Sequence, residues 1–239
     1  MLSLLVKAQP QISFEAAFAN CRRSSPDFDS CIKNALNTVR PYFKTGVPDW
    51  NLPPFDPFFA EEVVQHLGTP SIHYDLKLIN ATEAGWTESM VTDFRTDLKN
   101  NLVKYTQYFP AKFLKGIYEF NASIYGHRIA TSGYWSLDLY GFVQTTIITR
   151  QMGNDTSVGN APLKVTINVH RTKNMTLHIS NLLGGLKELE VLLDKIINTA
   201  WPPGFYLLKP IVNDLVGTAF TGIFNKAFEN FQFDQLINY

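Results

Sequence analysis

Few residues in this sequence have the types and spacing of a known catalytic arrangement. There is no GxSxG nucleophile turn, no HExxH pair, no glycine-rich phosphate loop and no CxxC motif. Serine, histidine and aspartate all occur, but a catalytic triad is defined by its geometry and is not indicated by presence alone. We therefore expect no enzymatic activity, no catalytic residues and no cofactor, and a lipid-ester hydrolase has no motif to support it.

Two histidines are the best candidates for a metal site. His170 and His178 flank a predicted hairpin, and on the solvated face of paired strands their ring nitrogens would form a two-nitrogen site. A third ligand at metal-binding spacing is missing. Two solvated strand histidines are the favoured interpretation, and we expect no bound metal.

Cysteines and glycosylation sequons bear on the compartment. Cys21 and Cys31 are the only cysteines, and their short loop suits a disulfide, although two cysteines are also compatible with free cytosolic thiols. The chain has four Asn-x-Ser/Thr sequons, where about two would arise by chance. These are Asn80, Asn121, Asn154 and Asn174. Together the two features favour secretion, so we expect the cysteines to be bonded and the sequons to be glycosylated.

The first residues suggest a processed leader. Val6, Lys7 and Ala8 fit the small-x-small pattern of a signal-peptide cleavage site, but the apolar run before them is too short for a complete signal core. We interpret residues 1–8 as a signal-peptide remnant. No repeat, low-complexity tract or polar linker divides the remainder, so residues 9–239 are expected to form a single domain.

Composition limits the possible partners. Of the 239 residues, 45% are hydrophobic and 13% aromatic, which is enough to build a sizeable core. Lys plus Arg equals Asp plus Glu at 21 each, and no basic cluster occurs. These features argue against a nucleic-acid partner and against a polybasic membrane patch.

Five segments alternate apolar and polar residues with a period of two. They span residues 72–78, 118–124, 135–139, 163–169 and 174–179. Clean alternation predicts an antiparallel sheet with one solvated face. Asn121 and Asn174 fall on the polar side of their strands, whereas Asn80 has the phase of Leu78. We therefore expect the strand to end or to bulge at Asn80.

A helix is expected near the amino terminus. Asp27 or Asp29 can cap it, its apolar face continues to Phe43, and it should stop at Gly46. Pro41 lies inside this pattern and should kink or shorten the helix. The proline- and aromatic-rich segment that follows is expected to be an ordered extended loop.

Two helices are expected at the carboxyl end. The first runs from about Gly185 to Trp201, where two prolines break it, and the second runs from Pro210 to Phe231. The second is apolar over most of its circumference and leaves one narrow polar strip for water. That strip comprises Asp214, Thr218, Thr221, Asn225 and Glu229. Polar and charged residues interrupt every window of membrane-crossing length, so we expect no stable membrane insertion.

The order helix, strands, helices predicts an α+β fold in which a large curved antiparallel sheet wraps a long C-terminal helix. The inner face of such a wrap either packs solid, the commoner outcome, or leaves a tunnel for an apolar ligand. Periodicity alone does not distinguish the two. The residues expected to line a tunnel are Tyr74, Tyr118, Phe120, Trp135 and Leu137 from the strands and Leu215, Ala219 and Ile223 from the helix.

Several motifs resemble those of the insect takeout and juvenile-hormone-binding family. The most specific are Cys21, Asp27 and Cys31, then the sequence GVP at the predicted helix end, then LPPFDPFF. Later similarities are Gly116-Ile117-Tyr118 entering a strand, NLLGGLKEL leading towards Trp201, and the terminal helix followed by FDQLINY. The resemblance covers essentially the whole chain from Phe14.

The resemblance implies a carrier secreted into hemolymph or another extracellular fluid, with the lipid-transfer-like super-roll fold. Its internal tunnel would hold a small hydrophobic ligand: a juvenile-hormone-like terpenoid, a fatty acid or an isoprenoid lipid. The hormone-specific polar residue of dedicated carriers has no match here, so the ligand stays open. We expect a monomer whose partner is that ligand. The alternative, from a different class, is an extracellular signalling or interaction protein with a filled core.

Overall fold

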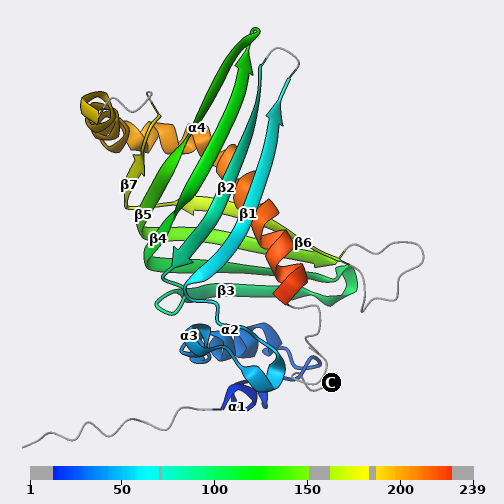
Figure 1. Ribbon diagram of the computed structural model, residues 1–239. Coiled ribbons are helices and arrows are strands. Elements are labelled where there is room, and N and C mark those ends of the chain that lie inside the picture. Colours follow the sequence, from blue (N-terminus) through cyan, green and yellow to red (C-terminus); the bar gives the residue numbers. More distant parts are fainter. Residues whose placement is uncertain (1–12, 70–71, 151–161, 183–186, 228–239) are drawn as a thin grey trace, which may run out of the picture.

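The computed structural model describes residues 13–69, 72–150, 162–182 and 187–227 (Figure 1). Four α-helices and seven strands make up this part of the chain, with two short 3-10 turns at Pro48–Trp50 and Leu98–Asn100. The helices are α1 (Phe14–Phe18), α2 (Phe28–Thr38), α3 (Tyr42–Thr45) and α4 (Lys187–Ala227). The strands are β1 (Phe58–Gly68), β2 (Ile72–Ala84), β3 (Met90–Asp97), β4 (Leu102–Ile124), β5 (His127–Arg150), β6 (Leu163–Arg171) and β7 (Asn174–Ile179).

The strands form one antiparallel sheet, in agreement with the alternation in the sequence. The order is β1-β2-β4-β5-β6, and β3 adds to β4 while β7 adds to β5. The two central strands, of 23 and 24 residues, each pair with different neighbours along their two halves. The sheet therefore curves strongly, and α4 crosses its inner side (Figure 1).

Two local expectations for the backbone are confirmed. Pro41 shortens the amino-terminal helix: α2 ends at Thr38, and α3 follows and ends at Thr45. Gly46 caps α3, and its φ of 70° suits a residue without a side chain. Asn80 has a φ of 50°, and the register between β2 and β4 shifts there. Because of this bulge, the residues that pack on the core change from Leu78 before it to Ala81 after it. The side chain of Asn80 itself is exposed.

The segment expected to be an extended loop ends earlier than its aromatic residues suggest. Strand β1 begins at Phe58, so the second half of the proline-rich stretch is already part of the sheet. Phe58 is buried in the main core, while the next residue, Phe59, is 56% exposed on the other face.

The two predicted C-terminal helices are joined in the single element α4, which contains Pro202, Pro203 and Pro210. In Figure 1 the gold first part of α4 is seen nearly end-on, while the orange-to-red remainder runs across the sheet. A proline inside a helix removes one backbone hydrogen bond and turns the axis. Here the prolines redirect the helix rather than separate it into two.

The polar strip of α4 was expected to face water, and for two of its members this is wrong. Thr221 Oγ1 accepts a hydrogen bond from the Val165 amide at 2.9 Å. Asn225 accepts from the Leu163 amide and donates to the Leu163 carbonyl, both at 2.8 Å. Asparagine and threonine thus take the place of a further strand along the edge of β6.

Two further asparagines of α4 bind strand backbone in the same way. Asn213 Oδ1 accepts from the Val169 amide at 2.9 Å, and Asn198 pairs with both the amide and the carbonyl of Leu177 in β7, at 2.8 and 3.0 Å. Gly217 lies where an added Cβ would come within 3.1 Å of the Val165 carbonyl oxygen. We call these contacts of Asn198, Asn213, Thr221 and Asn225 with β6 and β7 the edge seam.

Replacing Asn225 by alanine should lower the free energy of unfolding by about 1 to 3 kcal/mol, because the amide and carbonyl of Leu163 would lose their partner. Denaturant unfolding measures the loss, and amide hydrogen exchange at Leu163 should speed up. The neighbouring exposed Lys226→Ala is the matched control and should stay near the wild type. An equal loss in both variants would mean that the hydrogen bonds to Leu163 are not its source.

Two hydrophobic clusters form the interior. The main core joins the inner face of the sheet to the second half of α4 and includes Phe58, Val63, Trp86, Phe109, Leu139, Phe142, Ile167, Phe220 and Phe224. The second cluster packs α1 and α2 against β3. Cys21 and Cys31 lie in this second cluster and are joined as a disulfide, with 5.5 Å between their Cα atoms.

Candidate functional site

The residues predicted to line a ligand site lie on the inner face of the sheet or on the side of α4 that faces it. Leu137, Leu215, Ala219 and Ile223 are half-buried and pack against the main core. The structure therefore brings the strand and helix members of the predicted set to the same interior.

Tyr118 and Trp135 lie next to each other along the central strands. The Tyr118 ring is 4% exposed, and its hydroxyl donates to the Ser180 carbonyl at 2.7 Å. Trp135 pairs with Gly116, where an added Cβ would come within 3.1 Å of the indole nitrogen. Gly116 thus makes room for the indole, whose N–H is buried without a hydrogen-bond partner among the described residues.

Tyr74 and Phe120 form a third group, with ring centroids 5.6 Å apart. The Tyr74 hydroxyl donates to Gln65 at 3.1 Å, and the Gln65 amide donates to Asp214 on α4 at 2.7 Å and to the Ile211 carbonyl at 3.2 Å. Burial, with a further contribution from the Asp214 carboxylate, raises the pKa of Tyr74. This network attaches α4 to β1, at the other end of the strand order from the β6 contacts of the edge seam.

The inner face is more deeply buried around the second half of α4 than at the strand tips. Around the second half of α4, Phe109, Phe220 and Phe142 are 0%, 2% and 4% exposed. Towards the strand tips, on the same face of the sheet, Leu67 and Ile129 are 40% and 45% exposed. Figure 1 shows these tips extending beyond the helix.

The first part of α4 is similarly uncovered. Val191, Leu192 and Ile196 are 70%, 52% and 54% exposed. Among the described residues, the interior is thus tightly packed at one end and lined by accessible apolar side chains at the other. Contiguous accessible apolar side chains are found at interaction surfaces and in ligand-binding grooves.

A charged group inside the packed end was missed by the sequence analysis. Lys112 Nζ lies 2.7 Å from Glu83 Oε1 and donates to Gln144 Oε1 at 3.2 Å; the side chains of Lys112 and Glu83 are 3% and 9% exposed. The ammonium is also within 4.9, 4.5 and 5.1 Å of the ring centroids of Trp86, Phe109 and Phe142. We call Lys112, Glu83, Gln144 and Trp86 the interior polar cluster.

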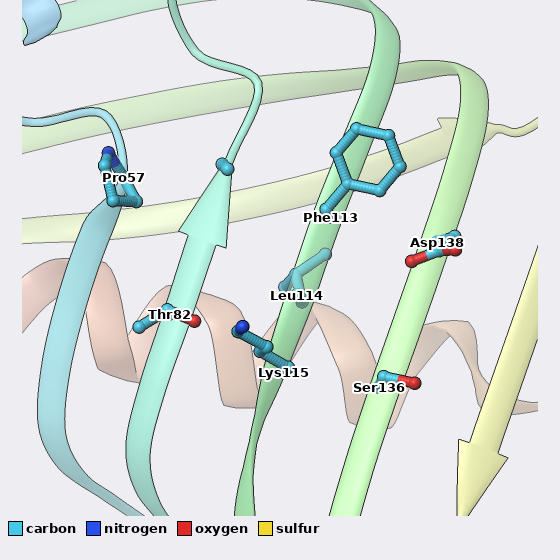
Figure 2. A pocket seen from close by; sticks show the side chains of 8 residues that line it. Pro57, Thr82, Phe113, Leu114, Lys115, Ser136 and Asp138 are labelled. Atoms are coloured by element: carbon cyan, nitrogen blue, oxygen red, sulfur yellow. The ribbon is translucent and has the colours of Figure 1, made fainter.

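Two hollows lie outside this interior. One, of about 480 Å³, lies on the face of the sheet turned away from α4, around Phe113, Lys115 and Asp138. Figure 2 shows these side chains on the strands with the helix passing behind. The other, of about 770 Å³, follows the edge seam between β6 and α4 and is lined by polar residues such as Asn168 and Thr218. Neither includes a predicted lining residue.

The two candidate metal-binding histidines have separate partners. His170 Nε2 lies 2.7 Å from Thr145 Oγ1, and burial, with smaller effects of Lys209 and Lys104, lowers the pKa of His170. His178 Nδ1 lies 2.5 Å from Asp194 on α4. In the described part of the chain, no three His, Cys, Asp or Glu side chains are grouped as a metal site.

Three of the four sequons can be placed in the structure. Asn80, Asn121 and Asn174 all have exposed side chains, as a glycan requires. Asn154 lies outside the described residues. Within the described ranges, no helix is both long and apolar enough to cross a bilayer.

Comparison with known proteins identifies the family. The model of the haemolymph juvenile hormone binding protein (JHBP) family matches residues 1–238. Among solved structures, the chain is similar to Takeout 1 of Epiphyas postvittana, with a TM-score of 0.58 and 20% identity over 83% of this chain and 90% of that one. This similarity confirms the predicted fold.

Two further comparisons add less. Lipopolysaccharide binding protein aligns with a TM-score of 0.32 and 8% identity over 82% of this chain and 37% of that one, which is too distant to support an argument. No curated protein matches the chain by sequence. The match to the family model along nearly the whole sequence is decisive, and the chain belongs to the haemolymph juvenile hormone binding protein family.

Proposed function

We propose that this protein is a secreted, non-catalytic carrier that holds a small hydrophobic ligand between the inner face of its sheet and α4. The observation that carries the proposal is the burial gradient on that face, from the packed phenylalanines to the accessible Leu67 and Ile129. Family membership and the curved sheet around a long helix support the same function.

The physical basis of binding would be burial of apolar surface. Each Å² of apolar surface removed from water contributes about 25 cal/mol, so a ligand of ordinary lipid size gains several kcal/mol without any charged contact. Tyr74, Tyr118, Phe120 and Trp135 would add aromatic walls, and Leu137, Leu215, Ala219 and Ile223 aliphatic ones. A juvenile-hormone-like terpenoid, a fatty acid and an isoprenoid lipid all fit this description.

Secretion belongs to the same proposal. The Cys21–Cys31 disulfide and the exposed sequons at Asn80, Asn121 and Asn174 support an extracellular, glycosylated protein. We propose that residues 9–239 act as one carrier domain and that the carrier is a monomer. Intact mass before and after glycosidase treatment of protein secreted from insect cells tests the glycosylation.

Ala219→Trp is the most direct mutational test of the ligand site. If Ala219 faces space that the ligand fills, the larger side chain should reduce the affinity for a fluorescent fatty acid at least tenfold while costing little stability. If the interior is filled, the same change is overpacking and should cost about 1 to 3 kcal/mol. Probe titration and thermal melting of the same variant separate the two outcomes.

The matched control is Thr218→Trp, one residue earlier on the exposed side of α4. It should bind the probe as the wild type does. Native mass spectrometry of the purified protein adds an independent readout, because a carrier should retain a co-purifying lipid. A large loss of melting temperature in Ala219→Trp, with no probe binding by the wild type, would support the filled interaction protein instead.

A further inference from the structure

We infer that the interior polar cluster is a recognition site for an uncharged oxygen acceptor on the ligand, such as an ester, ketone or aldehyde carbonyl or an alcohol. This inference rests on the proposed carrier function and narrows it. It assigns Gln144 and Trp86 as residues that select the ligand by its oxygen chemistry. Lys112 and Glu83 hold them in place.

The orientation of the Gln144 amide follows from its partner. A lysine ammonium can only donate hydrogen bonds, so the Gln144 atom 3.2 Å from Lys112 Nζ must be its oxygen. The Gln144 NH₂ group then points elsewhere, and it has no acceptor among the described residues although the side chain is 1% exposed.

Trp86 presents a second donor of the same kind. Its indole N–H is buried without a hydrogen-bond partner in the described part of the chain, and the whole residue is 3% exposed. Its ring is also one of those around the Lys112 ammonium, at 4.9 Å. A buried donor without a partner is costly, because it loses its hydrogen bonds to water and gains none. Both donors belong to side chains that contact the same ammonium, and an oxygen acceptor on the ligand would give them a partner.

The charges of the cluster favour an uncharged ligand oxygen over a carboxylate. Lys112 is already neutralised by Glu83 at 2.7 Å, and the two donors left over, on Gln144 and Trp86, are uncharged. A ligand carboxylate would put a second negative charge next to Glu83 in a water-poor interior, with one cation for two anions. A neutral carbonyl or hydroxyl accepts the two hydrogen bonds without that cost.

The cluster is also placed suitably for one end of a long apolar ligand. Lys112, Leu114, Tyr118 and Phe120 alternate along β4 on the same inner face. From Lys112 to Tyr118 the strand rises about 20 Å at 3.3 Å per residue. A ligand whose oxygen sits at the cluster would therefore lay its chain along the predicted lining residues.

The test compares three ligands with the same sixteen-carbon chain: methyl hexadecanoate, hexadecanoic acid and hexadecane. Displacement of a fluorescent probe from the full-length protein gives their relative affinities. We expect the ester to bind about 3- to 10-fold more tightly than the hydrocarbon, as hydrogen bonds to buried donors allow, and more tightly than the acid. Gln144→Leu should reduce the ester's advantage over hexadecane.

The infrared spectrum of the bound ester gives a second test, whose main measurement uses the wild-type protein and so does not depend on the folding of a variant. The infrared carbonyl band of isotope-labelled methyl hexadecanoate should move to lower frequency in the wild-type complex than in an alkane solvent, because the carbonyl accepts hydrogen bonds. Trp86→Phe keeps the aromatic packing while removing the N–H, and should return part of that shift.

The outcomes separate this inference from the carrier function. Equal affinities for ester and hydrocarbon with an unshifted carbonyl band would overturn the inference and leave the carrier function intact. Tighter binding of the acid would overturn it in favour of Lys112 as an anion anchor. If none of the three ligands displaces the probe, or the probe itself does not bind, the proposed function fails and the inference with it.

Discussion

Lys112→Met is expected to lower the free energy of unfolding by about 3 to 5 kcal/mol, because it leaves the Glu83 carboxylate buried without its counter-ion. Methionine has nearly the length of the lysine stem and is apolar, so the loss would come from the charge and not from a cavity. Chemical denaturation followed by circular dichroism measures it.

The matched control is the double variant Lys112→Met with Glu83→Leu. Replacing both partners of a buried ion pair by apolar residues is often neutral or stabilising, so the double variant should recover most of the loss. If it is as unstable as the single variant, the ion pair is not the source of the effect. In that case the ring contacts of the ammonium with Phe109 and Phe142 would be the stronger candidate.

Phe220→Ala should cost a similar amount, about 3 to 5 kcal/mol, through loss of buried area and the cavity left behind. Phe220 is 2% exposed, and its ring lies 5.5 Å from the rings of Phe58, Trp86 and Phe224. It therefore joins the start of β1, the segment before β3 and the end of α4. Thermal and denaturant unfolding give the size of the effect.

Phe113→Ala provides the comparison for Phe220. Phe113 is the same residue type on the outer face of the sheet and is 43% exposed, with one ring contact, to Tyr140 at 6.1 Å. Its removal should cost less than about 1 kcal/mol. If both variants lost the same stability, the packed end of α4 would not be the main source of stability that the burial suggests.

The strands that could be predicted are those with clean alternation. Segments 135–139 and 163–169 alternate without interruption, and β5 and β6 contain them in the expected phase. Strand β1 was not predicted as a strand, because Glu61 and Glu62 follow one another and shift the phase between Ala60 and Val63. A bulge of this kind is visible only once the partner strand fixes the register.

The residues of the candidate site were predictable to different degrees. Aromatic residues such as Tyr118 and Trp135 could be assigned to the inner face, because they share the strand phase of the apolar residues Phe120 and Leu137. The interior polar cluster could not be assigned to the interior. Lysine and glutamate are almost never fully buried unless they are paired, and the sequence does not show that Lys112 and Glu83 form a pair. The sequence Lys112-Phe113-Leu114-Lys115 even favours the wrong residue: Phe113 faces outwards and Lys112 inwards.

The edge seam was unpredictable for a related reason. Asn and Thr on an otherwise apolar helix look like the side that faces water, and only the position of β6 reveals their partners. Side-chain amides imitate the donor and acceptor pattern of a strand, but nothing local in the sequence distinguishes that use from solvation.

The edge seam also determines when the sheet can be completed during synthesis. Leu163 and Val165 obtain their partners from residues 62 and 56 positions later in the chain. While that stretch is still inside the ribosome, β6 presents a free edge to any other nascent chain or to a second copy. Docking of α4 therefore completes the sheet, and a chain truncated before Thr221 should accumulate as aggregates rather than as a shorter folded protein.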